Sequence, residues 1–259
     1  MKNNISAIII TKNEEKKLGE CIDSLSWVGE VLVIDTGSVD KTIQIATRKK
    51  AIVTSYDKGG FSDWRNQGAR EAKGDWLLYV DADERVTPLL RKEILKVTKK
   101  DSGITLYAIP RRNIILGKEM KHGGWWPDYV KRLMKKDSFV KWEGKLHENP
   151  VVEGSLEHLK NPLVHIKHSK LLEMVEKTNE WSEIEAKLLY KSGHPQMVGW
   201  RFFRIMLTEL WYRLIKLKGY KDGTEGVVYA IYQMWSKFVT YGKLWELQIN
   251  EKNNEGSNI

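Results

Sequence analysis

Residues Trp76 to Glu84 read Trp-Leu-Leu-Tyr-Val-Asp-Ala-Asp-Glu, an apolar run that ends in acidic residues. The apolar part predicts a buried strand. Asp81 and Asp83 follow at its carboxyl end, where the chain turns and side chains no longer alternate strictly between faces. Both carboxylates can then face one divalent cation, since hard cations take oxygen ligands and often bridge to substrate phosphates. An isolated Asp-x-Asp is more often a plain acidic turn, so its neighbours along the chain decide between the two interpretations.

Apolar, β-branched runs alternate with segments of helical periodicity through the first hundred residues. Strands are expected at 6–10, 30–35, 51–55 and 76–80. Helices are expected at 14–25, 41–49, 62–74 and from Thr87-Pro88 onward. This alternation predicts an α/β fold with a Rossmann-like, mainly parallel sheet flanked by helices.

Polar residues follow three of these predicted strands, at 11–14, 35–38 and 81–83. Ligands of parallel α/β sheets bind beyond the carboxyl ends of the strands. Three polar clusters from separate strands should therefore converge on one crevice, which is the predicted binding site.

Composition narrows the class of protein. The chain has 259 residues, 41% hydrophobic and 30% charged, which is typical of a globular protein with a sizeable core. A single cysteine, Cys21, cannot form an internal disulfide and fits a reducing compartment. Neither a signal peptide nor a transmembrane helix is expected, which favours the cytoplasm. The net charge of +9 favours anionic partners such as a nucleotide, a nucleic acid or an acidic membrane surface.

The second half of the chain has a different pattern. Strands are expected at 105–110 and 130–134, none after 169, and two long amphipathic segments at 199–218 and 226–247. Between His194 and Lys221 the chain carries six basic residues and one acidic residue, interleaved with aromatic and aliphatic side chains. These charges forbid a membrane span but suit a helix in the membrane interface. A helix packed on the protein core with solvated charges is the equal alternative.

Three motifs, at 8–14, 33–42 and 80–84, resemble family 2 glycosyltransferases of the GT-A fold, and the resemblance covers about residues 5 to 170. Further segments resemble the bacterial branch that builds lipopolysaccharide core: 126–129, 132–133, 146–148, 218–223 and Gly226.

The resemblance implies an inverting transfer from a UDP-sugar, taken as UDP-glucose, to a hydroxyl of a lipid-linked or surface glycan such as lipopolysaccharide core. It implies Mg²⁺ or Mn²⁺ as cofactor and no nucleic-acid partner. The expected location is cytoplasmic, with peripheral contact on the inner face of an anionic cell membrane left open. The expected organisation is a GT-A domain at 1–168, whose nucleotide-sugar half is about 1–100 and whose acceptor half is about 101–168. A helical extension at 169–249 and a disordered tail at 250–259 follow.

Site residues also follow from the resemblance. The nucleotide pocket and donor contacts are expected from Thr11, Asn13, Glu14, Asp35, Arg65, Asn66 and Asp81. The metal is expected on Asp83, with Asp81 and His147 as further ligands, and the base is expected to be Glu148, then Asp128, then Glu143. Plain structural roles compete with some of these: helix capping by Asn13, and a hydrogen-bonded structural role for His147. Asp40 is expected to cap a helix.

Other classes of protein fit the sequence less well than the transferase. A basic nucleic-acid-binding protein fits the charge, but no motif supports it and acidic strand ends would repel a phosphate backbone. A metal-dependent nucleotidyltransferase shares a similar sheet, but it would carry a glycine-rich loop after the first strand, and here no glycine occurs before Gly19. A catalytically dead adaptor is disfavoured because the acidic residues of the motifs are all present.

Overall fold

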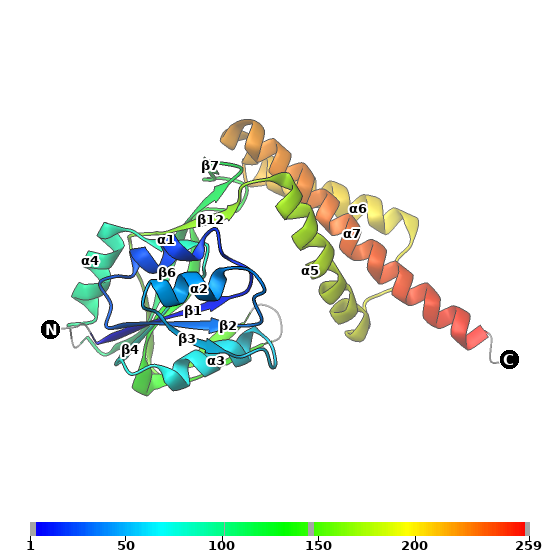
Figure 1. The fold of residues 1–259 in the computed structure, drawn as a ribbon. Helices are drawn as coiled ribbons and strands as arrows, with labels where there is room; N and C mark the ends of the chain where they lie inside the picture. The colour runs from blue at the N-terminus through cyan, green and yellow to red at the C-terminus, as the bar shows by residue number, and fades with distance from the viewer. Residues whose placement is uncertain (1–3, 101, 145–147, 257–259) are drawn as a thin grey trace. The chain divides into compact units, whose positions relative to one another are not determined.

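The computed structural model describes residues 4–100, 102–144 and 148–256, and Figure 1 shows the path of the chain. The chain forms two compact units. Unit 1 comprises residues up to Arg112 together with Pro127–Ile166, and unit 2 comprises Asn113–Trp126 and the chain from Lys167.

Unit 1 is an α/β sandwich built on a large twisted sheet. Its elements are β1 (Ile5–Thr11), α1 (Leu18–Ser24), β2 (Glu30–Asp35), α2 (Thr42–Arg48), β3 (Ile52–Ser55), α3 (Phe61–Glu71), β4 (Trp76–Tyr79), β5 (Glu84–Val86), α4 (Pro88–Val97), β6 (Ile104–Ile115), β8 (Asp128–Lys135), the 3₁₀ turn η1 (Lys136–Ser138), β9 (Phe139–Glu143), β10 (Asn149–Val152), β11 (Ser155–His158) and β12 (Leu163–His168). β6 and β12 run on into unit 2. The strand order is β3-β2-β1-β4-β8-β6-β12-β5, with β11 beside β6, and β9 pairs with β10.

The first four strands of this order are parallel, as the sequence predicted. The sheet becomes mixed where β8 joins β4 antiparallel and β6 joins β8 antiparallel. Alternation along the strands gives the sheet two apolar faces. Ala7 and Ile9 of β1 pack toward α1, α2 and α4, whereas Ile8 packs toward α3 and β9. This two-sided burial explains the unbroken apolar runs of β1, β2 and β4.

Unit 2 is largely helical. Its elements are the short β7 (Lys118–Glu119), α5 (Leu171–Lys191), α6 (Gly199–Trp211), a π-helical turn η2 (Tyr212–Lys216), a 3₁₀ turn η3 (Gly219–Asp222) and α7 (Gly223–Gly256). α5 and α6 both pack along α7, as Figure 1 shows. α5 lies within the helical extension expected at 169–249, but it is not one of the two amphipathic segments named there. α7 continues to Gly256, through residues 250–256 that were expected to be a disordered tail. The last three residues of the expected tail lie outside the described chain.

Segment 113–126 was expected inside the catalytic domain, but it belongs to unit 2. Ile115, Met120 and Trp125 share a small core with Met174 of α5 and Tyr229 of α7. This apolar contact explains why segment 113–126 groups with unit 2, although unit 1 continues after it in the sequence.

The segment resembling a family motif at 218–226 has a structural role in unit 2. The buried carboxylate of Asp222 accepts hydrogen bonds from the backbone N–H groups of Lys121 (3.0 Å) and His122 (2.7 Å) and contacts the His122 ring at 2.8 Å. A Cβ on Gly226 would lie 2.0 Å from the carbonyl oxygen of Gly219, so only glycine fits there. The motif therefore holds 113–126 against the start of α7.

Candidate active site

Two buried oxygens without hydrogen-bond partners lie at the ends of β1 and β2. Thr11 and Asp35 are register partners on these neighbouring strands, 2% and 1% exposed. Among the residues that the structure describes, Thr11 Oγ1 and Asp35 Oδ1 find no hydrogen-bond partner. A buried polar atom without a partner is costly, so such atoms in a native fold call for an explanation. A bound polar ligand beyond this sheet edge supplies one.

The other oxygen of Asp35 is fixed by the turn that follows β2. Asp35 Oδ2 accepts hydrogen bonds from the backbone N–H groups of Gly37 (3.1 Å) and Ser38 (3.0 Å). Gly37 adopts a φ of 99°, a conformation that favours glycine. The turn thus orients the carboxylate while leaving Oδ1 available as an acceptor.

Asn13 joins the loops after β1 and β2 and does not cap a helix. Its side-chain oxygen accepts a hydrogen bond from Val39 N (2.9 Å), and its backbone N–H donates to Ser38 Oγ (2.9 Å). Helix α1 begins later, at Leu18, without a side-chain cap. The capping interpretation of Asn13 is therefore wrong, because its left-handed backbone, with φ of 54°, turns the chain toward the second loop first.

Glu14 and Asp40 complete this junction. The backbone N–H of Glu14 donates to Thr42 Oγ1 (2.8 Å). Asp40 accepts from Thr42 N (2.9 Å), at the first residue of α2, and from Glu15 N (3.1 Å). The N-cap position of α2 is Lys41, so Asp40 lies one residue before the position expected for a cap. The backbone of Glu14 thus belongs to a rigid frame behind the edge that carries Thr11 and Asp35.

Asp81, at the end of β4, is held by two arginines. Its Oδ1 accepts from Arg65 of α3 (3.3 Å), and its Oδ2 contacts Arg132 of β8 in a close ion pair. Burial alone would raise the pKa of Asp81, but the charges of Arg132 and Arg65 lower it far below its usual range. Both carboxylate oxygens are therefore engaged, which disfavours Asp81 as a direct metal ligand.

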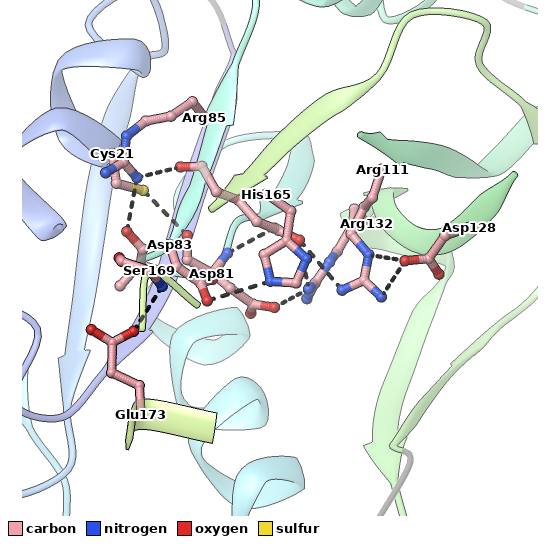
Figure 2. A network of polar contacts seen from close by, with 12 residues as sticks. Cys21, Asp81, Asp83, Arg85, Arg111, Asp128, Arg132, His165, Ser169 and Glu173 are labelled. Atoms are coloured by element: carbon pink, nitrogen blue, oxygen red, sulfur yellow. Dashed lines mark hydrogen bonds and ion pairs between the residues drawn. The ribbon is translucent and has the colours of Figure 1, made fainter. Parts of the chain in front are cut away.

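Glu84 contacts two arginines near Asp81. Its side chain is fully buried and lies 3.3 Å from Arg132 and 3.7 Å from Arg111, while its Oε2 accepts from the backbone N–H of Asp81 (3.0 Å). Although burial opposes its charge, the pKa of Arg132 is raised by the carboxylates of Asp81 and Glu84. Arg111 in turn pairs with Asp128 at 2.8 Å. Figure 2 shows Arg132 beside Asp81 and Arg111 beside Asp128. Together with Glu84, these pairs hold the acidic motif in the sheet.

Asp83 has a different partner, His165 of β12. The His165 Nε2 lies 3.3 Å from Asp83 Oδ2, and both residues are largely buried (Figure 2). Burial would raise the pKa of Asp83, but the hydrogen bond and charge of His165 lower it overall. The backbone pairing of Ile166 N with Asp83 O at 2.8 Å brings the imidazole to the carboxylate.

The Asp83–His165 pair suits a divalent cation. A carboxylate and an imidazole supply one oxygen and one nitrogen donor, a set that Mn²⁺ accepts more readily than Mg²⁺. No group of three or more histidine, cysteine, aspartate or glutamate side chains suited to a metal forms within the described ranges. Two protein ligands with the remaining positions filled by phosphate and water is a common arrangement for such ions. The expected ligand His147 lies outside the described residues.

Arg65 and Asn66 of α3 lie beside this edge with different tasks. Arg65 is buried and packs over the Trp142 ring at 4.7 Å, and its Nε has no hydrogen-bond partner among the described residues. The side-chain amide of Asn66 binds the backbone of β9. Its oxygen accepts a hydrogen bond from Trp142 N (2.7 Å), and its nitrogen donates to Trp142 O (3.0 Å). The structure thus gives Asn66 an evident structural role, while Arg65 keeps a donor group to spare.

The three candidate bases differ in their surroundings. Asp128 is tied to Arg111, and Glu143 is exposed and 3.1 Å from Lys141. Glu148 is half-buried, and its charge helps to support the protonated form of Arg65, whose pKa is lowered by burial. Glu148 therefore lies in the electrostatic neighbourhood of the Asp81–Arg65 pair.

Comparison with known proteins decides the class. The model of Glycosyl transferase family 2 matches residues 6–148, more than half of the chain. The chain belongs to glycosyl transferase family 2. This assignment replaces the alternatives of a nucleic-acid-binding protein and a nucleotidyltransferase.

Individual relatives of this glycosyltransferase span nearly its whole length. It is 26% identical to the lipopolysaccharide core biosynthesis glycosyltransferase LpsC of Rhizobium meliloti, over 93% of this chain and 92% of that protein. It is 25% identical to an uncharacterized glycosyltransferase of Rickettsia conorii, over 98% and 94% of the two chains. A crystal structure described as a mycobacterial protein has a TM-score of 0.50 at 18% identity, covering 74% and 76%. The fold is GT-A, with a helical C-terminal extension, as predicted.

Several residues of this candidate site were not assigned from the sequence. His165, Arg111 and Glu84 had no assigned role, and Arg132 appeared only within a motif. One signal was present: Leu163 and His165 occupy alternate, buried positions of a strand, which is an unusual place for a histidine. The pairings themselves depend on the strand order, which places β8 beside β4 and β12 beside β5.

Across the described residues, no helix of this glycosyltransferase is long and apolar enough to cross a bilayer.

Proposed function

We propose that this glycosyltransferase transfers a sugar, with inversion, from a UDP-sugar to a hydroxyl of a lipid-linked or surface glycan such as lipopolysaccharide core. The observation that carries the proposal is the pair of partnerless oxygens on Thr11 and Asp35, at the same sheet edge as Asp83 and His165. At one end of that edge, two oxygen atoms have no hydrogen-bond donor, and at the other end a carboxylate and an imidazole could hold a cation. A nucleoside diphosphate would complement both, because its nucleoside supplies donors and its diphosphate would bind the cation.

The nucleoside is proposed to lie against β1 and β2. Asp35 Oδ1 and Thr11 Oγ1 would accept hydrogen bonds from uracil N–H or ribose hydroxyls, and the loop carrying Asn13 and Glu14 would line the pocket. Arg65 would use its spare donor on the diphosphate or the sugar, since a guanidinium suits both. These assignments give specific partners to the residues that were expected from the sequence to contact the nucleotide sugar.

Mn²⁺ or Mg²⁺ is proposed to be held by Asp83 and His165. When bound, such an ion neutralises charge on a leaving diphosphate. Asp81 is proposed to contact either the ribose or a water molecule bound to the ion. Arg65 and Arg132 hold its carboxylate from two sides, which would preorganise the acidic edge for the donor.

The base is proposed to be Glu148. Inverting transfer requires a group that takes the proton from the attacking hydroxyl within hydrogen-bond reach. Glu148 is only half-buried, so an acceptor can approach it, whereas Asp128 is held by Arg111. Similarity to LpsC favours lipopolysaccharide core as the acceptor, and a lipid-linked acceptor would favour a peripheral position on the inner membrane face.

Glu148→Gln is expected to slow transfer about 10²–10⁴-fold, because the glutamine keeps the size of the side chain but cannot accept the proton. The assay would use UDP-glucose and truncated lipopolysaccharide, with the linkage of the product read by NMR of the anomeric proton. The wild type should give a β-linked product from this α-linked donor. Binding of UDP should be unchanged in the variant.

Glu143→Gln is the matched control, because this carboxylate is exposed and lies near Lys141. It should retain most of the wild-type rate. Equal rates for Glu148→Gln and the wild type would remove Glu148 as the base, and an α-linked product would contradict inversion.

A further inference from the structure

One face of α6 exposes large apolar side chains at helical spacing. Trp200, Phe203, Leu207, Trp211 and Ile215 are 59%, 71%, 63%, 55% and 52% exposed. The steps of three or four residues place them on one side of α6 and its continuation η2. We call this set, with the exposed basic residues Arg204 and Lys216, the α6 outer face. Soluble proteins rarely expose a contiguous apolar patch of this kind without a use for it.

Folding of unit 2 does not account for this surface. The opposite side of α6 already supplies the core contact, where Phe202 and Ile205 pack with Leu244 of α7 and its neighbours. The rings of Phe202 and Phe238 lie 6.0 Å apart. α6 is therefore apolar on both sides, and among the described residues its packing in the core involves the inner side.

The charges around the outer face are basic. Arg201 and Arg204 both lie over the Trp200 ring, each 5.4 Å from its centroid, and Lys216 lies 5.4 Å from the Tyr212 ring. Long basic side chains that run beside apolar groups can keep their charged ends in a polar layer.

Acidic side chains do not offset this charge. Glu209 is the only acidic residue between 199 and 218, and its carboxylate lies 2.7 Å from Arg213 with the side chain 18% exposed. The outer face is thus both apolar and cationic, which complements a surface that is apolar below and anionic above.

We propose that the α6 outer face docks this enzyme on an anionic lipid bilayer, with its aromatic and leucine side chains in the interface and its basic side chains among the headgroups. This combination is typical of helices that lie in the membrane plane. A second copy of the chain fits less well, because pairing this face with itself would bring Arg204 and Lys216 against like charges. The purpose of docking, which is to reach a lipid-linked acceptor, rests on the proposed function, but the binding itself does not.

Co-sedimentation with vesicles tests the proposal directly. The full chain would be mixed with vesicles of phosphatidylcholine alone and of phosphatidylcholine with phosphatidylglycerol. Wild type should bind the anionic vesicles more tightly and lose that preference as salt is raised. Leu207→Ser should weaken binding about tenfold, or about 1.4 kcal/mol, because a leucine leaves the apolar layer.

Leu89→Ser in α4 is the matched control, since Leu89 has the same exposed fraction of 63% as Leu207 but lies in unit 1. It should bind vesicles as the wild type does. Equal loss in both variants, or no binding of the wild type to anionic vesicles, would overturn the proposal. So would a dimer in sedimentation velocity that Leu207→Ser dissociates, because a second copy would then cover the face.

Titration of UDP separates the two proposals. Leu207→Ser is expected to bind UDP as the wild type does, because the substitution lies outside the donor site. If the wild type binds vesicles but not UDP, the proposal of a UDP-sugar donor is refuted and the membrane-docking proposal stands. If it binds UDP but not vesicles, only the membrane-docking proposal is refuted.

Discussion

Asp83→Asn is expected to lower the rate of transfer about 10²–10³-fold, the range seen when one electrostatic contact to developing charge is removed. Asparagine preserves the size of the side chain but removes the negative charge that would hold a cation beside His165. The low pKa of Asp83 means that this charge is present at neutral pH. The rate would be measured with saturating UDP-sugar and Mn²⁺.

Asp137→Asn provides the control, because Asp137 is exposed in the turn η1. It should leave the rate unchanged. Thermal unfolding of both variants would show that neither has lost its fold. An Asp83→Asn rate within about twofold of wild type, far less than the loss of such a contact gives, would mean that this carboxylate does not serve the donor.

Arg132→Met is expected to lower the free energy of unfolding by about 3–5 kcal/mol, the cost of breaking a buried ion pair from one side. Glu84 is fully buried and Asp81 keeps only Arg65, so methionine would leave both carboxylates poorly compensated. Urea denaturation followed by circular dichroism would measure the change.

Lys49→Met supplies the comparison, because the pair of Lys49 with Asp23 is exposed and should be worth about 0–1 kcal/mol. The folded-state pKa of Asp81 is lowered, so its contribution to stability is present above the ordinary aspartate pKa of about 4 and is lost as pH falls below it. The difference between wild type and Arg132→Met should therefore narrow in acid. Equal costs for the two methionine variants at neutral pH would contradict a central role for Arg132.

The parallel half of the sheet could be predicted because its signals are local. The strands β1, β2 and β4 are short apolar runs, and each ends in polar residues at one edge. The positions of Asp35 and Asp83 at that edge could be predicted for the same reason, while their roles in binding stay predictions. Local pattern is sufficient where each strand is buried on both faces.

The bounds of helix α5 were not predicted within the expected helical extension, because its buried stripe is not apolar enough to recognise. The stripe consists of Met174, Thr178, Ser182 and Ala186. Several larger apolar residues of the helix are exposed instead, among them Leu172 and Ile184. A search for apolar periodicity therefore fails, because packing against α7 uses small and hydroxyl side chains.

The residues that pair with the acidic motif could not be predicted from the sequence. Arg132 and His165 lie 51 and 82 residues after Asp81 and Asp83 in the numbering, and only the order of strands in the sheet brings them back. Spacing within a motif cannot reveal such pairs. Their identity matters, because they change Asp81 from a proposed metal ligand into a carboxylate held by arginines.

Calorimetric titration of UDP, GDP and CMP into the wild type and Asp35→Asn, with Mn²⁺ and with EDTA, is a direct test of the proposed UDP site. The amide of asparagine can keep the contacts to Gly37 and Ser38 but would present a donor where Oδ1 now offers an acceptor. The proposed UDP site predicts tighter binding of UDP than of the other two nucleotides. This binding should be strengthened by Mn²⁺ and weakened about tenfold or more in Asp35→Asn, since a hydrogen bond to a charged group is worth about 1.5–3 kcal/mol. Equal binding of the three nucleotides, or equal UDP binding by the two proteins, would contradict it.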